Sequence, residues 1–448
     1  MLVKDMTAGS PLRMILSFAL PMFIGTVFQQ IYSIVDTMVA GYNLGDQAIA
    51  AIGATSSLYA FIIDFAFGMN SGFALVVTRA FGSHDEEKLR RSIGGMLLLD
   101  AIVTVVLTVT AILFLKPLMR LMNTPQSIFD DAYRYMLIIC LGMITTLSFN
   151  MFSAILRAVG NSVTPLYFLV ISCLANIGMD LLMIVVLHLG VAGAAIATVL
   201  AQALSAVLSG VYLLRRYQPF LPKKKDLRIT MNLRRELFSN GLAMAFMYCV
   251  VDMGSVIFQG ANNALGETFI TSHTAARRII DITMAPLGTI SGATATFIGQ
   301  NWGAKRLDRV KEGLRLELLL SIAWGVLICG LVYLFGAVMV RFTTGTNNTD
   351  VIRNAVMSLR LHLPFYPVLG ALLALRTAMQ AMDIKLAPVL SSSMELGMKI
   401  VAAIWLIPRM GFLGTCITEP ITWLLCGLFL SIVYGNIHGK LDTNAASA

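Results

Sequence analysis

Long apolar stretches separated by short polar segments recur along the whole chain of 448 residues. An α-helix rises about 1.5 Å per residue, so about 20 apolar residues cross a hydrocarbon layer of about 30 Å. Twelve stretches reach that length. They predict transmembrane helices over residues 12–39, 47–80, 92–115, 130–156, 164–188, 191–214, 236–262, 267–300, 314–341, 350–378, 388–408 and 411–435. The pattern therefore predicts an all-α polytopic membrane protein.

The composition agrees with this class and argues against others. The chain is 57% hydrophobic and 13% charged, whereas about a quarter of the residues in a soluble domain are charged. No phosphate-binding loop and no nucleophile–base motif stands out, so we expect neither an enzyme, nor ATP-driven transport, nor a cofactor. The net charge of +9 could indicate a nucleic-acid partner. However, the basic residues lie in the connections between apolar stretches, so we expect no nucleic-acid partner.

Lysine and arginine are concentrated in alternate connections, including 79–91, 215–235 and 305–315. The other connections are sparse in them. By the positive-inside rule, this asymmetry predicts that both termini of a multi-pass membrane protein are cytoplasmic. The linker 215–235 is the one long and strongly basic connection, and such a segment can also bind anionic membrane lipid.

The two halves of the chain carry matching residues at an offset of 221. Leu44-Gly45-Asp46 matches Leu265-Gly266-Glu267, and Gly190 and Gly193 match Gly411 and Gly414. An even number of spans separates the matches, so both halves insert in the same orientation. We therefore predict two pseudo-symmetric six-helix bundles, as in some transporters. The predicted parts are a bundle at 1–214, a basic cytoplasmic linker at 215–235, a bundle at 236–435 and a cytoplasmic tail at 436–448.

Asp36 places a carboxyl group inside the first apolar stretch. A charged side chain at the centre of a membrane helix costs about 2.5–3.5 kcal/mol on insertion scales, so such a residue is a functional-site hypothesis. Pro21 lies in the same stretch, where neighbouring helices can tolerate a proline.

The motifs around these residues resemble a known family. They are Gln29-Gln30-x-Tyr32-x-x-Val35-Asp36-Thr37, Arg157-Ala158-Val159-Gly160-Asn161-Ser162, Asn176-x-x-x-Asp180, Gly299-Gln300-Asn301-x-Gly303 and Glu419-Pro420. Together they look like the bacterial MATE (multidrug and toxic compound extrusion) transporters, with the DinF-like branch as the best match. The resemblance spans essentially the whole chain and implies a cation-coupled efflux antiporter.

The resemblance also implies a cation or proton site at Asp36, Asn176, Asp180 and Thr198. The residues themselves allow it. Asn176 and Asp180 are four apart and share a helix face, and the helix rise places Asp36, Thr198 and Asp180 about 7, 10 and 12 Å below the outer membrane face. Carboxyl, amide and hydroxyl oxygens suit Na+, and two nearby buried carboxyl groups also suit a proton. A hydrogen-bonded structural cluster is the alternative.

The second half departs from this pattern, because it carries basic as well as acidic residues inside its apolar stretches. We interpret them as a polar network that holds the bundle together: Asp252, Arg277, Arg278, Asp281, Arg360, Glu395, Lys399 and Glu419. Arg277 with Asp281, and Glu395 with Lys399, are spaced for pairs at i and i+4. We also expect Lys399 to pair with Glu419, which would replace the ion by a fixed ammonium. Alternatively, an arginine contacts substrate.

These patterns together predict a monomeric secondary antiporter. It would export amphipathic, cationic small molecules in exchange for H+ or Na+, by rocking two bundles around a cavity and bending the first span near Pro21. A flippase for lipid-linked saccharide precursors is the alternative, because the second half carries surplus arginine. A channel is disfavoured because the sequence has no filter-like polar loop.

Overall fold

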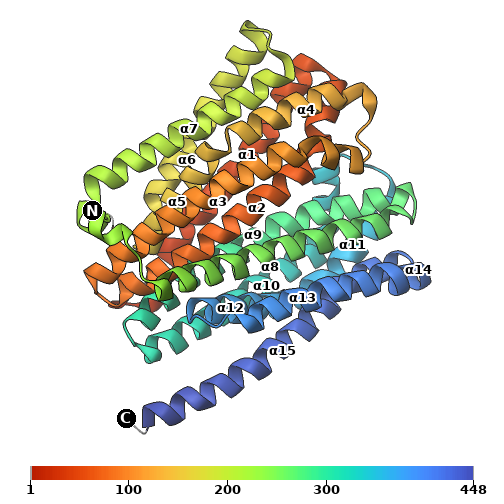
Figure 1. Cartoon of the computed structure of the whole chain (residues 1–448). Helices are drawn as coiled ribbons and strands as arrows, with labels where there is room; N and C mark the ends of the chain where they lie inside the picture. The colour runs from red at the N-terminus through yellow and green to blue at the C-terminus, as the bar shows by residue number, and fades with distance from the viewer. Residues whose placement is uncertain (1–2, 447–448) are drawn as a thin grey trace. The chain divides into compact units, whose positions relative to one another are not determined.

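The computed structural model describes residues 3–446, with side chains up to residue 437. Almost all of this part is helical, and it contains no β-strand (Figure 1). The α-helices are α1 (Pro11–Leu44), α2 (Asp46–Gly82), α3 (Glu86–Leu121), α4 (Gln126–Leu141), α5 (Met143–Ala158), α6 (Val163–Asp180), α7 (Gly190–Arg216), α8 (Met231–Asn263), α9 (Glu267–Gly303), α10 (Leu307–Thr344), α11 (Thr349–His362), α12 (Tyr366–Ala381), α13 (Leu386–Val401), α14 (Ile407–Met410) and α15 (Phe412–Ala446). Two π-helical segments, η1 (Leu181–Val186) and η5 (Ala402–Leu406), follow α6 and α13. Short 3-10 turns are η2 (Gln218–Phe220), η3 (Lys224–Leu227) and η4 (Leu363–Phe365).

Each predicted transmembrane stretch lies within one helix or one run of helices, with at most two residues outside it, and several of the helices extend five or more residues further. In the described part of the chain, ten such helices are long and apolar enough to cross a membrane. The pair α4 and α5, bent by 47° at its break, makes an eleventh. The twelfth, α9, is 37 residues long but more polar, because it carries Arg277, Arg278 and Asp281. The predicted fold class is confirmed.

The break between α4 and α5 falls at Gly142. A Cβ atom there would lie 2.2 Å from a methyl group of Val199 on α7. Only glycine lets the two helices approach this closely, so the sequence itself fixes the position of the bend.

The chain forms two compact units. The first comprises the residues up to Met6 together with Ser17–Ala245. In it, α7 packs against α4, α5 and α6, and α2 packs against α3, α4 and α5. Phe73, Met96 and Leu156 are completely buried in one of its apolar clusters. Leu113 on α3 is 68% exposed, as is expected of an apolar side chain that faces lipid.

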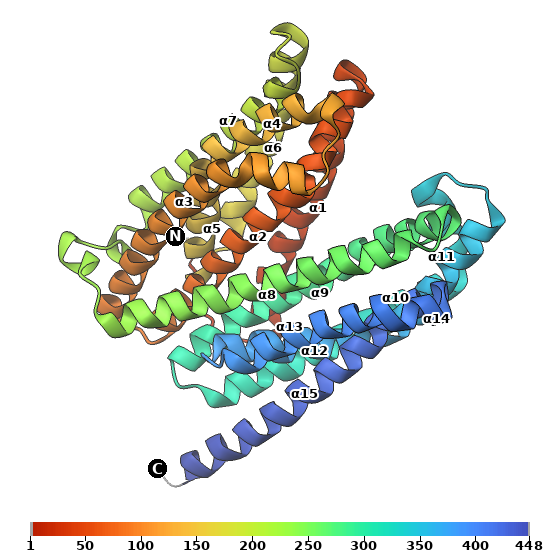
Figure 2. The same ribbon diagram turned by 45° about the vertical axis from the view of Figure 1, so that its right-hand side comes forward.

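The second unit comprises Thr7–Leu16 and the chain from Phe246 onward. Its central helix α10 packs against α9 and α12, and α15 packs against α11, α12 and α13 (Figure 2). Tyr366 on α12 is completely buried and donates a hydrogen bond to the Ile280 carbonyl of α9 over 3.2 Å. This bond satisfies a hydroxyl group that would otherwise be costly to bury.

The predicted repeat is present in the backbone. Gly45 and Gly266, which precede α2 and α9, have φ of +79° and +102°. Gly190 and Gly411, at the start of the last long helix of each half, have φ of +61° and +59°. Glycine adopts such conformations without strain. Both pairs are 221 residues apart, the offset that the sequence gives. The domain boundaries and the cytoplasmic position of the linker and tail stay predictions.

Candidate functional site

The four residues predicted for the ion site meet inside the first unit. Asp36 lies on α1, Asn176 and Asp180 on the last turns of α6, and Thr198 on α7. Asn176 and Asp180 are 1% and 0% exposed. The Asn176 amide is assigned to the orientation that satisfies both of its ends. Its nitrogen then donates to Asp180 Oδ2 over 3.0 Å, and its oxygen accepts from the Thr198 backbone N–H over 3.2 Å.

The carboxyl groups of Asp36 and Asp180 interact directly with each other. Asp180 Oδ1 is buried and has no hydrogen-bond partner. No lysine, arginine or histidine of the described residues forms an ion pair with either carboxyl group. Two ionised carboxylates at this separation repel each other strongly in a medium of low dielectric constant. The arrangement is therefore suited to hold a positive charge that comes from outside the protein.

The oxygen atoms at this site fit both of the expected ions. Two carboxyl groups and the Asn176 amide oxygen are hard ligands of the kind that Na+ takes, and a single proton shared by the carboxyl groups would also remove their repulsion. The Thr198 hydroxyl group donates to the Ala194 carbonyl over 3.0 Å, and this bond uses its proton and not its oxygen lone pairs. No cluster of three His, Cys, Asp or Glu side chains that could hold a metal ion occurs in the described residues.

Tyrosine hydroxyl groups surround the acidic pair. The Asn176 amide donates to Tyr32 Oη over 3.1 Å, and Tyr32 also interacts with the Thr198 side chain. Tyr59 and Tyr135 lie within electrostatic reach of Asp36. Tyr32 could have been identified from the sequence, because it lies one helical turn before Asp36 in the same motif. No comparable sequence feature distinguished Tyr59 or Tyr135 from the other tyrosines of the chain.

The helix that carries Asp180 changes its winding directly after this residue. The π-helical segment η1 begins at Leu181, and the second half repeats the feature at Ala402, shortly after Lys399. Such segments are rare and are often found at functional sites. Nothing in the residue pattern predicted them.

The second unit arranges its charges differently. Glu419 on α15 accepts from Arg277 Nη1 of α9 over 2.9 Å, and its other oxygen lies 3.3 Å from His362 Nε2 of α11. The Nδ1 atom of His362 faces the Ser358 carbonyl at 2.9 Å. Both ring nitrogens thus lie beside oxygen atoms. Glu419 therefore pairs with one permanent cation of the protein, Arg277, and lies beside the His362 ring.

Both predicted i, i+4 pairs are confirmed. Arg277 Nε lies 2.9 Å from Asp281 Oδ1, and Lys399 Nζ lies 3.2 Å from Glu395 Oε1. Arg376 of α12, which was not part of the predicted network, lies 3.4 Å from the other oxygen of Glu395.

The predicted direct pair between Lys399 and Glu419 is wrong for the described residues, although Lys399 lies within electrostatic reach of Glu419. Lys399 on α13 faces Glu395 one turn earlier and lies 3.4 Å from Ser255 Oγ on α8. Glu419 faces α9 and α11 instead. The prediction rested on the similar depth of the two residues in their predicted spans. Depth does not determine which neighbouring helix a side chain faces.

Two other members of the predicted network, Arg278 and Arg360, do not join these clusters. Arg278 is exposed and forms no ion pair in the part of the chain that the structure describes. Arg360 lies over the Tyr333 ring, 5.3 Å from its centroid, and donates to the Tyr333 carbonyl. Asp252 lies on α8 and is half-buried. Pro21 lies inside α1, and the helix continues through it.

Comparison with known proteins agrees with this architecture. A model of the MatE family matches residues 21–182 and 243–405, one segment in each half and together more than half of the chain. The chain belongs to the MatE family. The resemblance inferred from the motifs is thereby confirmed.

Named relatives of this MATE protein are bacterial. The Bacillus subtilis protein "Probable multidrug resistance protein YoeA" is 26% identical over 71% of the chain and 70% of its own length. The Escherichia coli protein "DNA damage-inducible protein F" is 24% identical over 64% of the chain and 63% of its own length. A solved MATE structure in a bent conformation superposes with a TM-score of 0.90 at 19% identity, covering 99% of this chain and 98% of the other. This likeness shows the shared fold.

Two buried acidic residues of the MATE protein were missed by sequence reasoning. Glu317 on α10 is 1% exposed and interacts with Ser291 and Thr294 of α9. Asp100 on α3 is 3% exposed and interacts with Asn70 of α2. Both lie in predicted transmembrane stretches, so the criterion that selected Asp36, an acidic residue inside such a stretch, would also have selected them.

Proposed function

We propose that this MATE protein is a secondary active antiporter that exports amphipathic, cationic small molecules in exchange for inward H+ or Na+. The observation that supports the proposal is the contact between Asp36 and Asp180 without a cationic side chain beside them. A coupling site must bind and release its ion during the cycle. An acidic pair that depends on an external cation meets this requirement.

In the proposed mechanism, ion and substrate favour different conformations of one cycle. Ion binding at Asp36 and Asp180 removes the repulsion between two carboxylates on different helices, α1 and α6. The neutralised pair stabilises a closer packing of α1, and Pro21 in the same helix provides the point at which it bends. The closed form then releases the substrate. In this proposal the protein is a monomer in the bacterial inner membrane, with both termini in the cytoplasm and membrane lipid around it.

The Pro21 step has its own test. Proline removes one backbone hydrogen bond within α1 and so permits a bend. Pro21→Ala restores that bond, and we expect slower extrusion with unchanged ion binding. Extrusion at the wild-type rate would remove this step and leave the ion site in place.

The main test uses everted membrane vesicles and a fluorescent cationic dye. Dye uptake should require an ion gradient, and collapsing the proton and sodium gradients separately identifies the coupling ion. The Asp36→Asn variant should lose gradient-driven uptake, whereas Asp130→Asn, which changes an exposed acid on α4, should retain it. Gradient-independent uptake by the wild type would overturn the proposal.

A second candidate function is a flippase for lipid-linked saccharide precursors, favoured by the surplus arginine of the second half. Arg277 is not available for a pyrophosphate in this structure, because its guanidinium group forms ion pairs with Asp281 and Glu419. Binding of a lipid pyrophosphate to the purified protein, competed by inorganic pyrophosphate, would support the flippase.

A further inference from the structure

Each half of the chain buries one acidic side chain that takes no part in the proposed ion site. Asp100 lies on α3 and Glu317 on α10, and they are 3% and 1% exposed. The helices α3 and α10 begin at Glu86 and Leu307, 221 residues apart, which is the offset of the repeat. In that register Glu317 matches Met96, which lies one helical turn before Asp100 on the same face of the helix. The two acids therefore occupy nearly the same place in the two halves.

The polar partners of the two acids match as well. Asp100 interacts with the amide group of Asn70 on α2, and Glu317 interacts with the hydroxyl group of Ser291 on α9. Asn70 and Ser291 are 221 residues apart. The first pair lies within the first unit and the second pair within the second unit. Each half thus places a buried carboxyl group against the same position of the preceding long helix.

Neither acid has a cationic partner in the part of the chain that the structure describes. The helices α2, α4 and α5 pack against α3, and α9, α11 and α12 pack against α10. No charged side chain of these helices acts on Asp100 or Glu317, whose influences are burial and neutral polar groups. An unpaired carboxylate is too costly to keep in an apolar medium, so such a group loses its charge instead. Each acid therefore needs a positive charge that no side chain supplies.

The hydrogen atoms available to Glu317 can be counted. Thr377 of α12 donates its hydroxyl proton to the Leu373 carbonyl over 2.9 Å. The 3.0 Å bond between Ser291 Oγ and Thr377 Oγ1 therefore uses the Ser291 proton, and Ser291 turns only lone pairs toward Glu317. Thr294 of α9 can satisfy one carboxyl oxygen, but Oε2 of Glu317 has no hydrogen-bond partner. A neutral carboxyl group resolves this arrangement, because it donates to Ser291, whereas a carboxylate would face the lone pairs.

The same count applies to Asp100. Asn70 is 1% exposed, and neither end of its amide group has a hydrogen-bond partner besides Asp100. An amide group donates from its nitrogen and accepts on its oxygen. A carboxylate at Asp100 can accept from the nitrogen but leaves the amide oxygen without a donor. A neutral carboxyl group satisfies both ends of Asn70, because it accepts on one oxygen and donates from the other.

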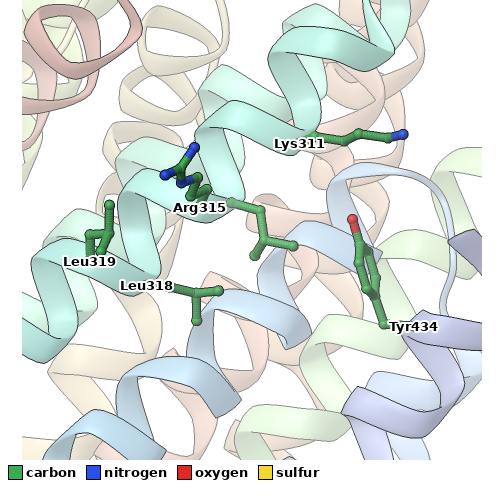
Figure 3. A pocket seen from close by; sticks show the side chains of 6 residues that line it. Lys311, Arg315, Leu318, Leu319 and Tyr434 are labelled. Carbon is green, nitrogen blue, oxygen red and sulfur yellow. The ribbon is translucent and has the colours of Figure 1, made fainter.

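The surroundings favour a proton over a metal ion. A metal ion needs several oxygen ligands, and Asp100 interacts only with Asn70. A pocket of about 360 Å³ beside α10 does not include Glu317. It is lined by Leu314 and, as Figure 3 shows, by Lys311, Arg315, Leu318, Leu319 and Tyr434. The lining residues of α10 follow the spacing of one helix face, and Glu317 lies outside that spacing. A proton needs neither a cavity nor further ligands.

We propose that each half of the protein binds one proton at this matched position, so that Asp100 and Glu317 are neutral carboxylic acids in the folded protein at neutral pH. The two protons complete the hydrogen bonds between α3 and α2 and between α10 and α9. This assignment does not depend on the coupling proposed for Asp36 and Asp180.

Infrared spectroscopy of the purified full-length protein at neutral pH tests the proposal directly, because neutral carboxyl groups and carboxylates absorb at different frequencies. We expect Asp100→Asn and Glu317→Gln each to remove part of the neutral carboxyl absorption, and the double variant to remove both parts. Asp130→Asn, which changes an exposed acid on α4, should remove carboxylate absorption only. Loss of carboxylate absorption in the Asp100 and Glu317 variants would show that both acids are ionised and would overturn the proposal.

The pH dependence of unfolding provides a second readout. An acid that is neutral in the folded protein ionises on unfolding above its ordinary pKa of about 4, so it lowers stability as the pH rises. Each such acid raises the unfolding equilibrium constant about tenfold per pH unit. We therefore expect the melting temperature of the wild type to fall more steeply between about pH 5 and pH 8 than that of Asp100→Asn or Glu317→Gln.

Comparing slopes protects this test against variants that are merely less stable. Glu317→Asp keeps an acid at the same position, so its melting temperature should fall with pH as steeply as that of the wild type even if it starts lower. Asp130→Asn should also keep the wild-type slope. Equal slopes for the wild type and for the Asn and Gln variants at Asp100 and Glu317 would overturn the proposal.

Discussion

The two halves of the molecule share a backbone design and differ in the source of positive charge. In the first unit, Asp180 precedes a π-helical segment and contacts Asp36, with only neutral partners nearby. In the second unit, Lys399 lies just before the corresponding segment and is held by Glu395. Both halves therefore contain the π-helical segment, but the charged residue that precedes it is an acid, Asp180, in the first half and a base, Lys399, in the second.

This difference separates an exchangeable charge from a permanent one. A buried carboxylate needs a positive partner, because the membrane interior solvates it poorly. Arg277 supplies this partner to Glu419 from within the chain. Among the described residues no lysine, arginine or histidine pairs with Asp36 or Asp180, and the proposed function gives this role to an exchangeable ion. Under that proposal, coupling belongs to the first unit and structural stability to the second.

The largest expected effect is the loss of transport when both acids of the first unit are neutralised. With Asp36→Asn and Asp180→Asn together, no negative charge remains to attract an ion. Gradient-driven dye uptake into everted vesicles should fall to the rate of vesicles without the transporter. The folded fraction, measured by size-exclusion chromatography, should be unchanged. Normal uptake by this variant would contradict the proposal that the first unit carries the ion coupling.

Glu419→Gln should affect stability and leave coupling intact. Removing one partner of a buried ion pair costs about 3–5 kcal/mol, and the partial exposure of Arg277 reduces this to roughly 2–3 kcal/mol. We expect a lower melting temperature and an unchanged number of ions exchanged per dye molecule. A changed exchange ratio at normal stability would mean that the second unit also takes part in coupling.

Lys399→Met should cost less, about 1–2 kcal/mol, because Glu395 keeps its contact with Arg376 at 3.4 Å. The matched control is Lys385→Met, whose pair with Asp383 is partly exposed. Surface pairs contribute about 0–1 kcal/mol. Thermal unfolding measures both variants. A larger loss for Lys385→Met would contradict the assignment.

Tyr32→Phe should have the smallest effect. It removes the hydroxyl group that accepts a hydrogen bond from Asn176 and keeps the ring. A hydrogen bond contributes about 0.5–1.5 kcal/mol, so ion affinity should change about two- to tenfold. Ion-dependent dye uptake at graded gradients gives this affinity. Complete loss of uptake would instead give Tyr32 an essential role, equal to that of Asp36.

The sequence by itself determined the fold class and suggested the residues of the acidic site. Apolar length defined the twelve helices, and matched glycines defined the repeat. The motifs suggested the ion-site residues, and the spacing of Asn176 and Asp180 agreed with a shared face. These conclusions follow from backbone hydrogen bonding and from the cost of burying charge, both of which act locally along the chain.

Only the tertiary structure decided which charges meet. The sequence placed Lys399 and Glu419 at one depth, but Glu419 contacts Arg277 and His362. It also did not reveal the π-helical turns, the tyrosines around Asp36 or the partners of Glu317. Lipid is as apolar as the protein core, so hydrophobic periodicity does not fix how a membrane helix is rotated about its axis. That rotation is set by packing against helices distant in the chain, and it selects the partner of each polar side chain.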